Sequence, residues 1–326
     1  MIGLIDFDGK ITNLALMKIS TYYKAHGEQV EFVKPGKKYD KVYCSVLYSW
    51  NKEKAARLRH VYQNIEFGGT GWDMHIKLPT EIEACRPDYD LYTVDDILPR
   101  IRGGIATKKS KIKKAEQIIN AGIGFTSRGC IRKCGFCVVP KKEGMLHHVA
   151  EISDLLNPRS NVLILLDNNI TADPDCIDKL HEIRDRGLVV DITQGIDVRL
   201  MTPEIAKALS EIKLLRSLHY AWDLMEFESQ VIRGIKILAQ YVPVWKHMCF
   251  MLIGFNTSFE EDIYRFTKLT EMGVDPYIMP YNKQYKSEKL RHFTRWVNSR
   301  IYKVCSFEEY EPWIKSQAIE MQMSMI

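Results

Sequence analysis

The stretch Gly124-Phe-Thr-Ser-Arg-Gly-Cys130-Ile-Arg-Lys-Cys134-Gly-Phe-Cys137 places three cysteines within eight residues, directly after a short apolar strand predicted over 122–126. Three thiolates on one tight loop can each bind one iron of a four-iron four-sulfur cluster, because soft sulfur ligands favour such clusters. The fourth iron then has no protein ligand, and an open position is what a catalytic metal site needs. Gly129 and Gly135 are expected to let the backbone turn closely around the cluster. The stretch therefore predicts a redox-active metal site.

Two other interpretations of this cysteine group stay open. A structural zinc ion needs a fourth ligand, which His147 or His148 could supply, although such sites usually use two spaced pairs of ligands. The three thiols could also be close in sequence by coincidence and simply be buried. The isolated cysteines are expected to be buried apolar side chains; they are Cys44, Cys85, Cys176, Cys249 and Cys305.

The bulk properties are those of a globular protein with room for one large domain and a smaller one. The chain has 326 residues, of which 46% are hydrophobic and 27% charged. It contains no apolar run of about eighteen residues, and the N-terminal MIGLIDFDGK does not have the pattern of a signal peptide. We therefore expect a cytoplasmic protein without membrane contacts, whose thiols are reduced.

From Ile123 onward, strand and helix patterns alternate for about 160 residues. The predicted strands are 122–126, 162–166, 189–193, 217–221, 244–253 and 276–279, and the predicted helices between them include 177–186, 203–209, 226–238 and 260–271. Six strand–helix units in series predict an α/β fold with a partial β/α barrel over 122–285. Residues 286–326 are rich in charged and aromatic residues, and we expect a helical cap there.

The N-terminal region shows the same alternation on a smaller scale. Strands are predicted over 2–6, 30–33, 41–47 and 64–67, with helices over 13–25 and 52–62. This pattern predicts a small doubly wound, Rossmann-like unit over 1–85. Residues 86–121, which carry Pro87 and Pro99, are expected to link the two domains.

The CxxxCxxC motif, with Phe136 just before its last cysteine and a strand before it, resembles the radical S-adenosylmethionine (SAM) superfamily over 122 to about 285. The resemblance implies a partial (β/α)6 barrel in which Cys130, Cys134 and Cys137 hold a four-iron four-sulfur cluster. The SAM amino and carboxylate groups would chelate the open iron. After one-electron reduction by a donor such as flavodoxin or ferredoxin, SAM would be cleaved to a 5′-deoxyadenosyl radical, which abstracts hydrogen from a substrate.

The resemblance also implies where SAM would be bound. The SAM amino group would meet Asp167, Asn168 or Asn169 after the second strand, although the Gly-Gly-Glu found there in many members is absent. An alternative for Asn169 is a turn that caps the next helix. The ribose and carboxylate would meet side chains after the third and fourth strands, with Arg199 the candidate ion-pair partner of the carboxylate. Those side chains are Gln194, Asp197, Arg199, His219, Tyr220 and Asp223. Gly254, after the fifth strand, would flank the adenine.

The N-terminal unit resembles the cobalamin-binding domain that precedes many radical SAM barrels. Ser45-Val46-Leu47 and Gly68-Gly69 match its Ser-x-Leu and Gly-Gly elements. The Asp-x-His-x-x-Gly motif that supplies the lower histidine ligand is absent, although members without this histidine still bind cobalamin. The resemblance therefore leaves cobalamin as a candidate cofactor.

The substrate is not specified by these motifs, and a net charge of +5 permits a polyanionic partner without requiring one. A nucleic acid is favoured by the lysine run 108–114, by Lys141-Lys142 and by the basic and aromatic segment 286–303, and solvated helix faces are the alternative. The reaction would be a modification or methylation of a nucleic acid or a peptide. The competing class is a non-catalytic iron–sulfur or zinc protein that binds nucleic acid, which would need neither the barrel pattern nor the fifth-strand glycine.

Overall fold

The computed structural model describes residues 1–101, 107–281, 287–312 and 314–315. The predicted boundary between barrel and cap, at 285 and 286, lies outside the described residues. The chain divides into two compact units. Unit 1 comprises Met1–Gly129, Val138–Leu166 and Leu188–Val190, and unit 2 comprises Cys130–Cys137, Asp167–Gly187 and Asp191–Ile326. Among the described residues, no helix combines the length and apolarity needed to cross a membrane.

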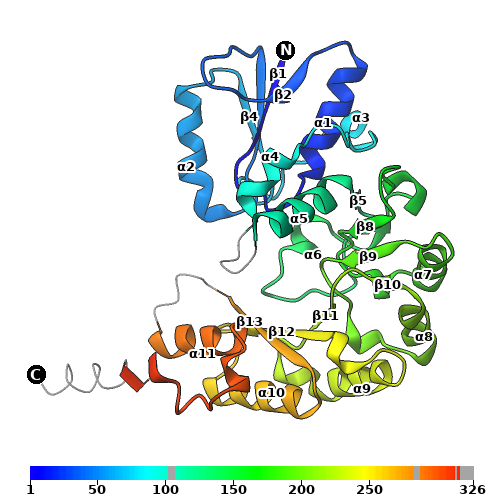
Figure 1. The fold of residues 1–326 in the computed structure, drawn as a ribbon, viewed down its shortest axis with the longest axis vertical. Helices are drawn as coiled ribbons and strands as arrows, with labels where there is room; N and C mark the ends of the chain where they lie inside the picture. The colour runs from blue at the N-terminus through cyan, green and yellow to red at the C-terminus, as the bar shows by residue number, and fades with distance from the viewer. Residues whose placement is uncertain (102–106, 282–286, 313, 316–326) are drawn as a thin grey trace, which may run out of the picture. The chain divides into compact units, whose positions relative to one another are not determined.

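The N-terminal part of unit 1 is a parallel four-stranded sheet. Its strands are β1 (Ile2–Asp6), β2 (Val30–Phe32), β3 (Lys41–Ser45) and β4 (Ile65–Gly68), in the order β2-β1-β3-β4. Ile2 pairs with Val30 on one side and with Lys41 on the other. Helices α1 (Leu14–Ala25) and α2 (Lys52–Ala56) lie on opposite faces of the sheet (Figure 1). The predicted small doubly wound arrangement is therefore confirmed.

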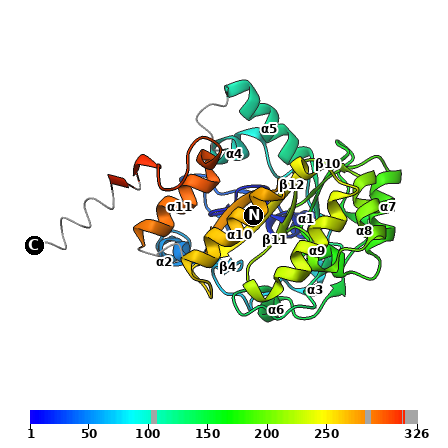
Figure 2. The same ribbon diagram turned by 90° about the horizontal axis from the view of Figure 1, so that it is seen from below.

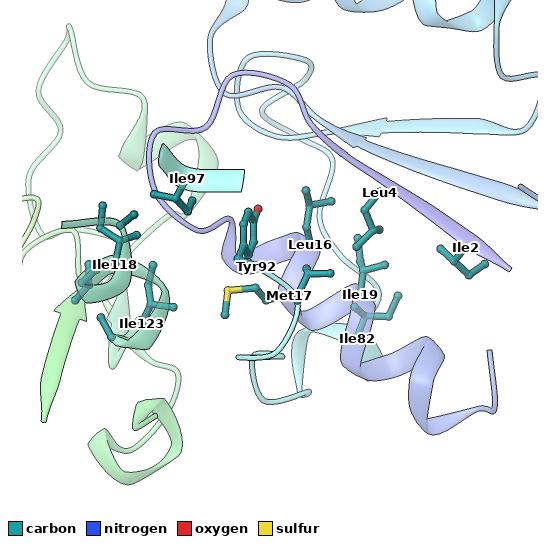
Figure 3. Close-up of a cluster of buried hydrophobic side chains, with 14 residues drawn as sticks. Ile2, Leu4, Leu16, Met17, Ile19, Ile82, Tyr92, Ile97, Ile118 and Ile123 are labelled. Carbon is teal, nitrogen blue, oxygen red and sulfur yellow. The ribbon is translucent and has the colours of Figure 1, made fainter. Parts of the chain in front are cut away.

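The core of this unit forms between α1 and the sheet. Asn13 caps α1 by accepting a hydrogen bond from the backbone N–H of Leu16. Leu16, Met17 and Ile19 then face Leu4 and Ile2 (Figure 3). Helices α3 (Thr80–Glu83), α4 (Val94–Ile97) and α5 (Lys108–Asn120) add apolar side chains to this cluster. In α5 the buried residues are Ala115 and Ile118, while Lys108, Lys109, Lys113 and Lys114 are exposed, so the lysine run is a helix face in contact with solvent.

The strand that precedes the cysteines begins a second sheet. β5 (Gly122–Gly124) pairs in parallel with β8 (Val162–Leu165), and the sheet order is β10-β9-β8-β5, with β9 at Val189–Ile192 and β10 at Lys213–Leu214. After β5, β6 (Ser127–Arg128) forms a short antiparallel pair with β7 (His147–His148), and α6 (Val139–Lys142) lies between them in sequence. Neither β6 nor β7 was predicted from the sequence.

Unit 2 contains the other predicted barrel strands, β11 (Leu218–Ala221), β12 (His247–Ile253) and β13 (Asp275–Pro280), paired in parallel in that order. A parallel bridge joins Ile196, just after β9, to Tyr220 of β11. All six predicted strands are therefore present in an α/β fold with parallel sheets. They form two sheets connected by this bridge, and closure into a barrel is not seen among the described residues.

The helices of unit 2 follow the predicted strand–helix order. They are α7 (Cys176–Asp185), α8 (Pro203–Glu211), α9 (Glu228–Ala239), α10 (Phe259–Glu271) and α11 (Glu288–Asn298). Figure 2 shows α9 and α10 side by side over the β11-β12-β13 sheet. On β12 the side chains of Cys249, Met251 and Ile253 are fully buried, whereas the alternate residues are only half-buried. One face of this sheet is therefore apolar core, and the other is more open.

Three details differ from the sequence-based expectation. Residues 244–246 form a short 3-10 turn after Pro243 and do not belong to β12. The helix predicted over 52–62 ends at Ala56 and continues as a 3-10 turn over Arg57–His60. In the C-terminal segment Phe293 and Trp296 are buried, and Tyr302 donates a hydrogen bond to Asp275. Phe293 and Trp296 are therefore part of the folded core, and Tyr302 is half-buried, so these side chains do not form an exposed platform for stacking on bases.

Candidate active site

The cysteine loop, Cys130–Cys137, begins directly after Gly129, whose backbone lies in the left-handed region at φ +85°. A Cβ atom at Gly129 would lie 2.2 Å from the carbonyl oxygen of Met145, so this position requires glycine. Gly135 does not have a positive φ, and a Cβ there would only touch Phe255 at 3.7 Å. The expected conformational role of glycine therefore holds for Gly129 and is wrong for Gly135.

The three cysteine side chains of the loop are partly exposed. The backbone N–H of Cys137 donates to the carbonyl of Cys134 at 3.0 Å, which closes a turn between the last two cysteines. The sulfur of Cys130 accepts hydrogen bonds from the backbone N–H of Arg132 at 3.4 Å and from Nδ2 of Asn169 at 3.5 Å. N–H groups that point at sulfur stabilise negative charge on it, which suits a thiolate ligand.

Charges around Cys134 bring several predicted residues together. Burial raises the pKa of the Cys134 thiol, and the Arg199 guanidinium opposes this rise. The thiols of Cys137 and Cys130 and the Asp223 carboxyl raise the same pKa further. Cys130, Cys137, Arg199 and Asp223 therefore all lie within electrostatic reach of Cys134 in unit 2.

Asp197 and Arg199, after β9, form the most strongly connected charge pair near the loop. Nε and Nη2 of Arg199 donate to the two carboxylate oxygens of Asp197 at 2.6 and 2.9 Å. Nε of Arg132, inside the cysteine loop, donates to the same carboxylate at 3.0 Å. Burial alone would raise the pKa of Asp197, but the hydrogen bonds and charges of Arg199 and Arg132 outweigh it and hold the pKa below its usual range. Asp197 is therefore a carboxylate at neutral pH.

The predicted residues after β8 are polar and largely buried. Asp167 and Asn169 are buried, and Asn168 is half-buried. Besides donating to Cys130, Asn169 accepts a hydrogen bond from the Thr171 hydroxyl at 3.0 Å. Asn169 occupies the N-cap position of the 3-10 turn Ile170–Ala172, as the alternative predicted, but its side chain makes no capping hydrogen bond there.

Aromatic rings lie between the loop and the turn after β12. Phe136 meets Phe255 edge to face, with ring centroids 5.5 Å apart, and Phe255 meets Tyr281 at 4.8 Å. Gly254 has a φ of +72°, which only glycine adopts readily, and it turns the chain so that Phe255 follows β12 toward Phe136. The predicted pair of Phe136 and Gly254 is thus connected through Phe255, a residue that the sequence analysis did not select.

Three other predicted residues lie at different depths of the same unit. Gln194 is exposed in the turn after β9. Asp223 accepts a hydrogen bond from the backbone N–H of Leu252 at 3.0 Å, and burial raises its pKa. His219 lies within β11, where its ring stacks on Phe250 at 5.1 Å.

His219 provides a prediction about pH. Burial lowers the pKa of His219 below the ordinary value of 6.5, and its buried Nδ1 atom has no hydrogen-bond partner among the described residues. Folded His219 therefore resists protonation, so its contribution to stability is present above pH 6.5 and is lost as the pH falls through its folded pKa. We expect the free energy of unfolding in urea to fall between about pH 7.5 and about pH 5.5, and His219→Phe to reduce this fall.

The slope contributed by one histidine cannot exceed about 1.4 kcal/mol per pH unit. His247 is also buried with a lowered pKa and stays in the variant, so a smaller pH dependence is expected to persist. His60→Phe is the control, because His60 is exposed. Equal pH dependence of the wild-type protein and His219→Phe would contradict the prediction.

The residues of the N-terminal unit that resemble a cobalamin site have partners within the chain. The Ser45 hydroxyl accepts a hydrogen bond from Nδ2 of Asn13 at 2.8 Å and is buried. A Cβ atom at Gly69 would lie 2.4 Å from the carbonyl oxygen of Val46, so this glycine serves close packing of the backbone on itself. These contacts account for Ser45 and Gly69 without a ligand, and cobalamin binding stays a prediction.

The donor set of the cysteine loop does fit an iron–sulfur cluster. It offers three thiols, N–H donors to one sulfur, and a guanidinium near another. Within the part of the chain that the structure describes, no three His, Cys, Asp or Glu side chains are close enough to hold a single metal ion. A four-iron four-sulfur cluster does not require three ligands around a single metal ion, because each cysteine binds a different iron atom. His147 and His148, the candidate zinc ligands, are exposed in β7 of unit 1.

Comparison with known proteins finds similar solved structures. No family model and no curated protein matches the chain. Two solved structures of SuiB from Streptococcus suis are similar to it, one bound to the precursor peptide SuiA and one bound to S-adenosylmethionine. They share 14% and 13% sequence identity with this chain, each with a TM-score of 0.40.

These alignments cover 62% and 64% of this chain and 53% and 57% of SuiB. The match therefore extends over little more than half of the length of SuiB. Because the TM-score is below 0.5, the likeness carries no argument about activity or ligands.

Proposed function

We propose that this chain is a radical SAM enzyme whose cluster is held by Cys130, Cys134 and Cys137. The observation that carries the proposal is the cysteine loop itself, with three partly exposed cysteines within eight residues, N–H donors at Cys130 and the Arg199 charge at Cys134. The loop follows the first of six strands in a series of parallel strand–helix units. When bound, a four-iron four-sulfur cluster supplies the electron that cleaves SAM to a 5′-deoxyadenosyl radical, which takes a hydrogen atom from the substrate.

The chain's own residues would bind and orient SAM. A guanidinium has five N–H groups, and Asp197 uses those on Nε and Nη2 of Arg199, so others are left for the SAM carboxylate. Asp167, Asn168 and Gln194 would offer acceptors to the amino group and the ribose, and Asp223 would do the same from the end of β11. Gly254 and the ring of Phe136, packed on Phe255, would flank the adenine and exclude water.

The remaining parts of the proposal concern partners. A one-electron donor of the flavodoxin or ferredoxin class would reduce the protein. The substrate would be a nucleic acid or a peptide that is modified after hydrogen abstraction. No cobalamin step is included, because Ser45 and Gly69 are engaged within the chain.

The test is anaerobic reconstitution with iron and sulfide, followed by reduction with dithionite and addition of SAM. We expect about four iron and four sulfide per chain and the formation of 5′-deoxyadenosine, measured by mass spectrometry. The control reaction omits the reductant. A protein that takes up a cluster but releases no 5′-deoxyadenosine, with or without candidate RNA and peptides, would contradict the proposal and favour a non-catalytic iron–sulfur protein.

A further inference from the structure

A chain of hydrogen bonds leaves the cysteine loop at Cys130 and returns to it at Arg132. Nδ2 of Asn169 donates to the Cys130 sulfur, and Oδ1 of Asn169 accepts from the Thr171 hydroxyl. The Thr171 oxygen in turn accepts the backbone N–H of Asp197 at 2.9 Å. The Asp197 carboxylate then accepts from Nε of Arg132. The chain is closed within unit 2 and uses residues from three separate loops.

The three middle members of this chain are buried, so the loss of any of their hydrogen bonds is costly. Asn169 and Thr171 are 4% and 5% exposed, and the Asp197 side chain is 6% exposed. Buried polar groups cost free energy when a partner is removed, so each bond constrains the next. The contact with Thr171 also fixes the orientation of the Asn169 amide, because the hydroxyl takes Oδ1 and leaves Nδ2 for the sulfur.

We propose that Asn169 and Asp197 are positioning residues for the cluster site, Asn169 by donating to the Cys130 sulfur and Asp197 by holding Arg132 of the cysteine loop. This inference rests on the proposed function. An N–H···S bond stabilises the additional negative charge of a reduced cluster and so raises its reduction potential. The Asp197–Arg132 pair fixes the loop segment between Cys130 and Cys134 and so slows the loss of iron.

The assignment changes how Asn169 is interpreted. Its two polar atoms are engaged by Cys130 and Thr171, so it acts on the cysteine and not on the SAM amino group. That role then falls to its neighbours Asp167 and Asn168. Asp197 likewise connects Arg132 to Arg199. Its carboxylate accepts two hydrogen bonds from the Arg199 guanidinium and so holds that group in place.

The first test measures the midpoint potential of the reconstituted cluster without SAM, by titration followed by electron paramagnetic resonance. Asn169→Leu has a similar volume and no N–H group. We expect the equilibrium constant for one-electron reduction of its cluster to fall about tenfold, which lowers the midpoint potential by about 59 mV. Thr171→Val keeps Asn169 but removes the hydroxyl that orients it, and a smaller fall is expected. The control is Asn256→Leu, at an exposed asparagine of unit 2.

The second test measures how fast a chelator removes iron. Asp197→Asn and Arg132→Gln are each expected to speed iron loss about 10-fold or more, in the range found for outer-shell partners of metal ligands. The double variant should lose iron no faster than the quicker single variant, because both substitutions break the same hydrogen bond between Arg132 and Asp197. Lys133→Gln is the matched control, since Lys133 is an exposed cation of the same loop.

The outcomes separate the two proposals. Wild-type protein that binds no cluster would overturn both. Wild-type protein that binds a cluster and cleaves SAM, with unchanged potential in Asn169→Leu and additive iron loss in the double variant, would overturn this inference alone. A lower potential in Asn169→Leu, together with non-additive iron loss for Asp197 and Arg132, would support it.

Discussion

Replacing Cys130, Cys134 or Cys137 with alanine is expected to abolish cluster binding and 5′-deoxyadenosine formation. Each thiol is a separate iron ligand in the proposed site, and removing one leaves its iron without a protein bond. Loss of an outer-shell partner alone typically costs 10- to 100-fold in metal affinity or activity, so loss of a ligand should lower the product by at least about 100-fold. Iron and sulfide content and product yield, measured on the same anaerobic sample, check the prediction.

The chain offers matched controls for these substitutions. Cys85 and Cys305 are partly exposed like the three loop cysteines. Alanine at either position should leave the cluster content and the yield of 5′-deoxyadenosine unchanged. A loop variant that kept its full cluster, or a Cys85→Ala protein that lost it, would show that the ligands have been assigned to the wrong cysteines.

Replacing Arg265 with methionine is expected to lower the free energy of unfolding more than any other substitution proposed for this protein. The Arg265 side chain is fully buried and donates to the carbonyls of Trp222 and Leu252 at 2.6 and 2.9 Å, and to Asp262 at 2.5 Å. It therefore connects the ends of β11 and β12 to α10. Removing one partner of a buried ion pair leaves an uncompensated charge and unsatisfied carbonyls, and such changes cost about 3–5 kcal/mol.

Urea unfolding followed by circular dichroism measures this loss as a change in the free energy of unfolding. Lys268→Met is the control on the same helix, because Lys268 pairs with Glu271 at 3.8 Å on the surface. Exposed pairs contribute little, so the control should change stability by less than about 1 kcal/mol. An Arg265→Met protein as stable as this control would contradict the structural role of Arg265.

The elements of the fold could largely be predicted from the sequence, because their signals are local. The strand predicted over 2–6 coincides with β1, and the helix predicted over 260–271 differs from α10 by one residue. Hydrophobic periodicity and helix caps decide such spans, and both can be seen within a short window. The start of β12 and the end of α2 were predicted less accurately. Each borders a 3-10 turn, whose local geometry is not visible in the hydrophobic periodicity.

The arrangement of the site could be predicted only in part. Arg199 and Asp223, which follow the third and fourth predicted strands, both affect the pKa of the Cys134 thiol, whereas their roles toward SAM stay predictions. The partners of Asn169 and Asp197 depend on which side chains tertiary packing brings together, and sequence spacing does not contain that information. Arg132 was not selected, although it lies between Cys130 and Cys134 in the sequence and its side chain pairs with Asp197.

In the C-terminal segment, amino-acid composition and helical spacing pointed to different locations for the aromatic residues. Its basic and aromatic residues favoured a nucleic-acid surface, yet Phe293, Trp296 and Val297 are buried. These positions follow the i, i+3, i+4 spacing of the apolar face of a helix. The spacing, and not the residue types, indicated their location in the core.

The division of the chain into units has a consequence for how this protein can be engineered. The backbone passes between unit 1 and unit 2 five times, and the eight residues of the cysteine loop are joined to unit 1 at both ends. Neither unit therefore corresponds to one continuous gene segment. A truncation after residue 166 would remove Asn169 and Asp197 while keeping the cysteines, so fragments and domain fusions should preserve the whole span from residue 122 to β13.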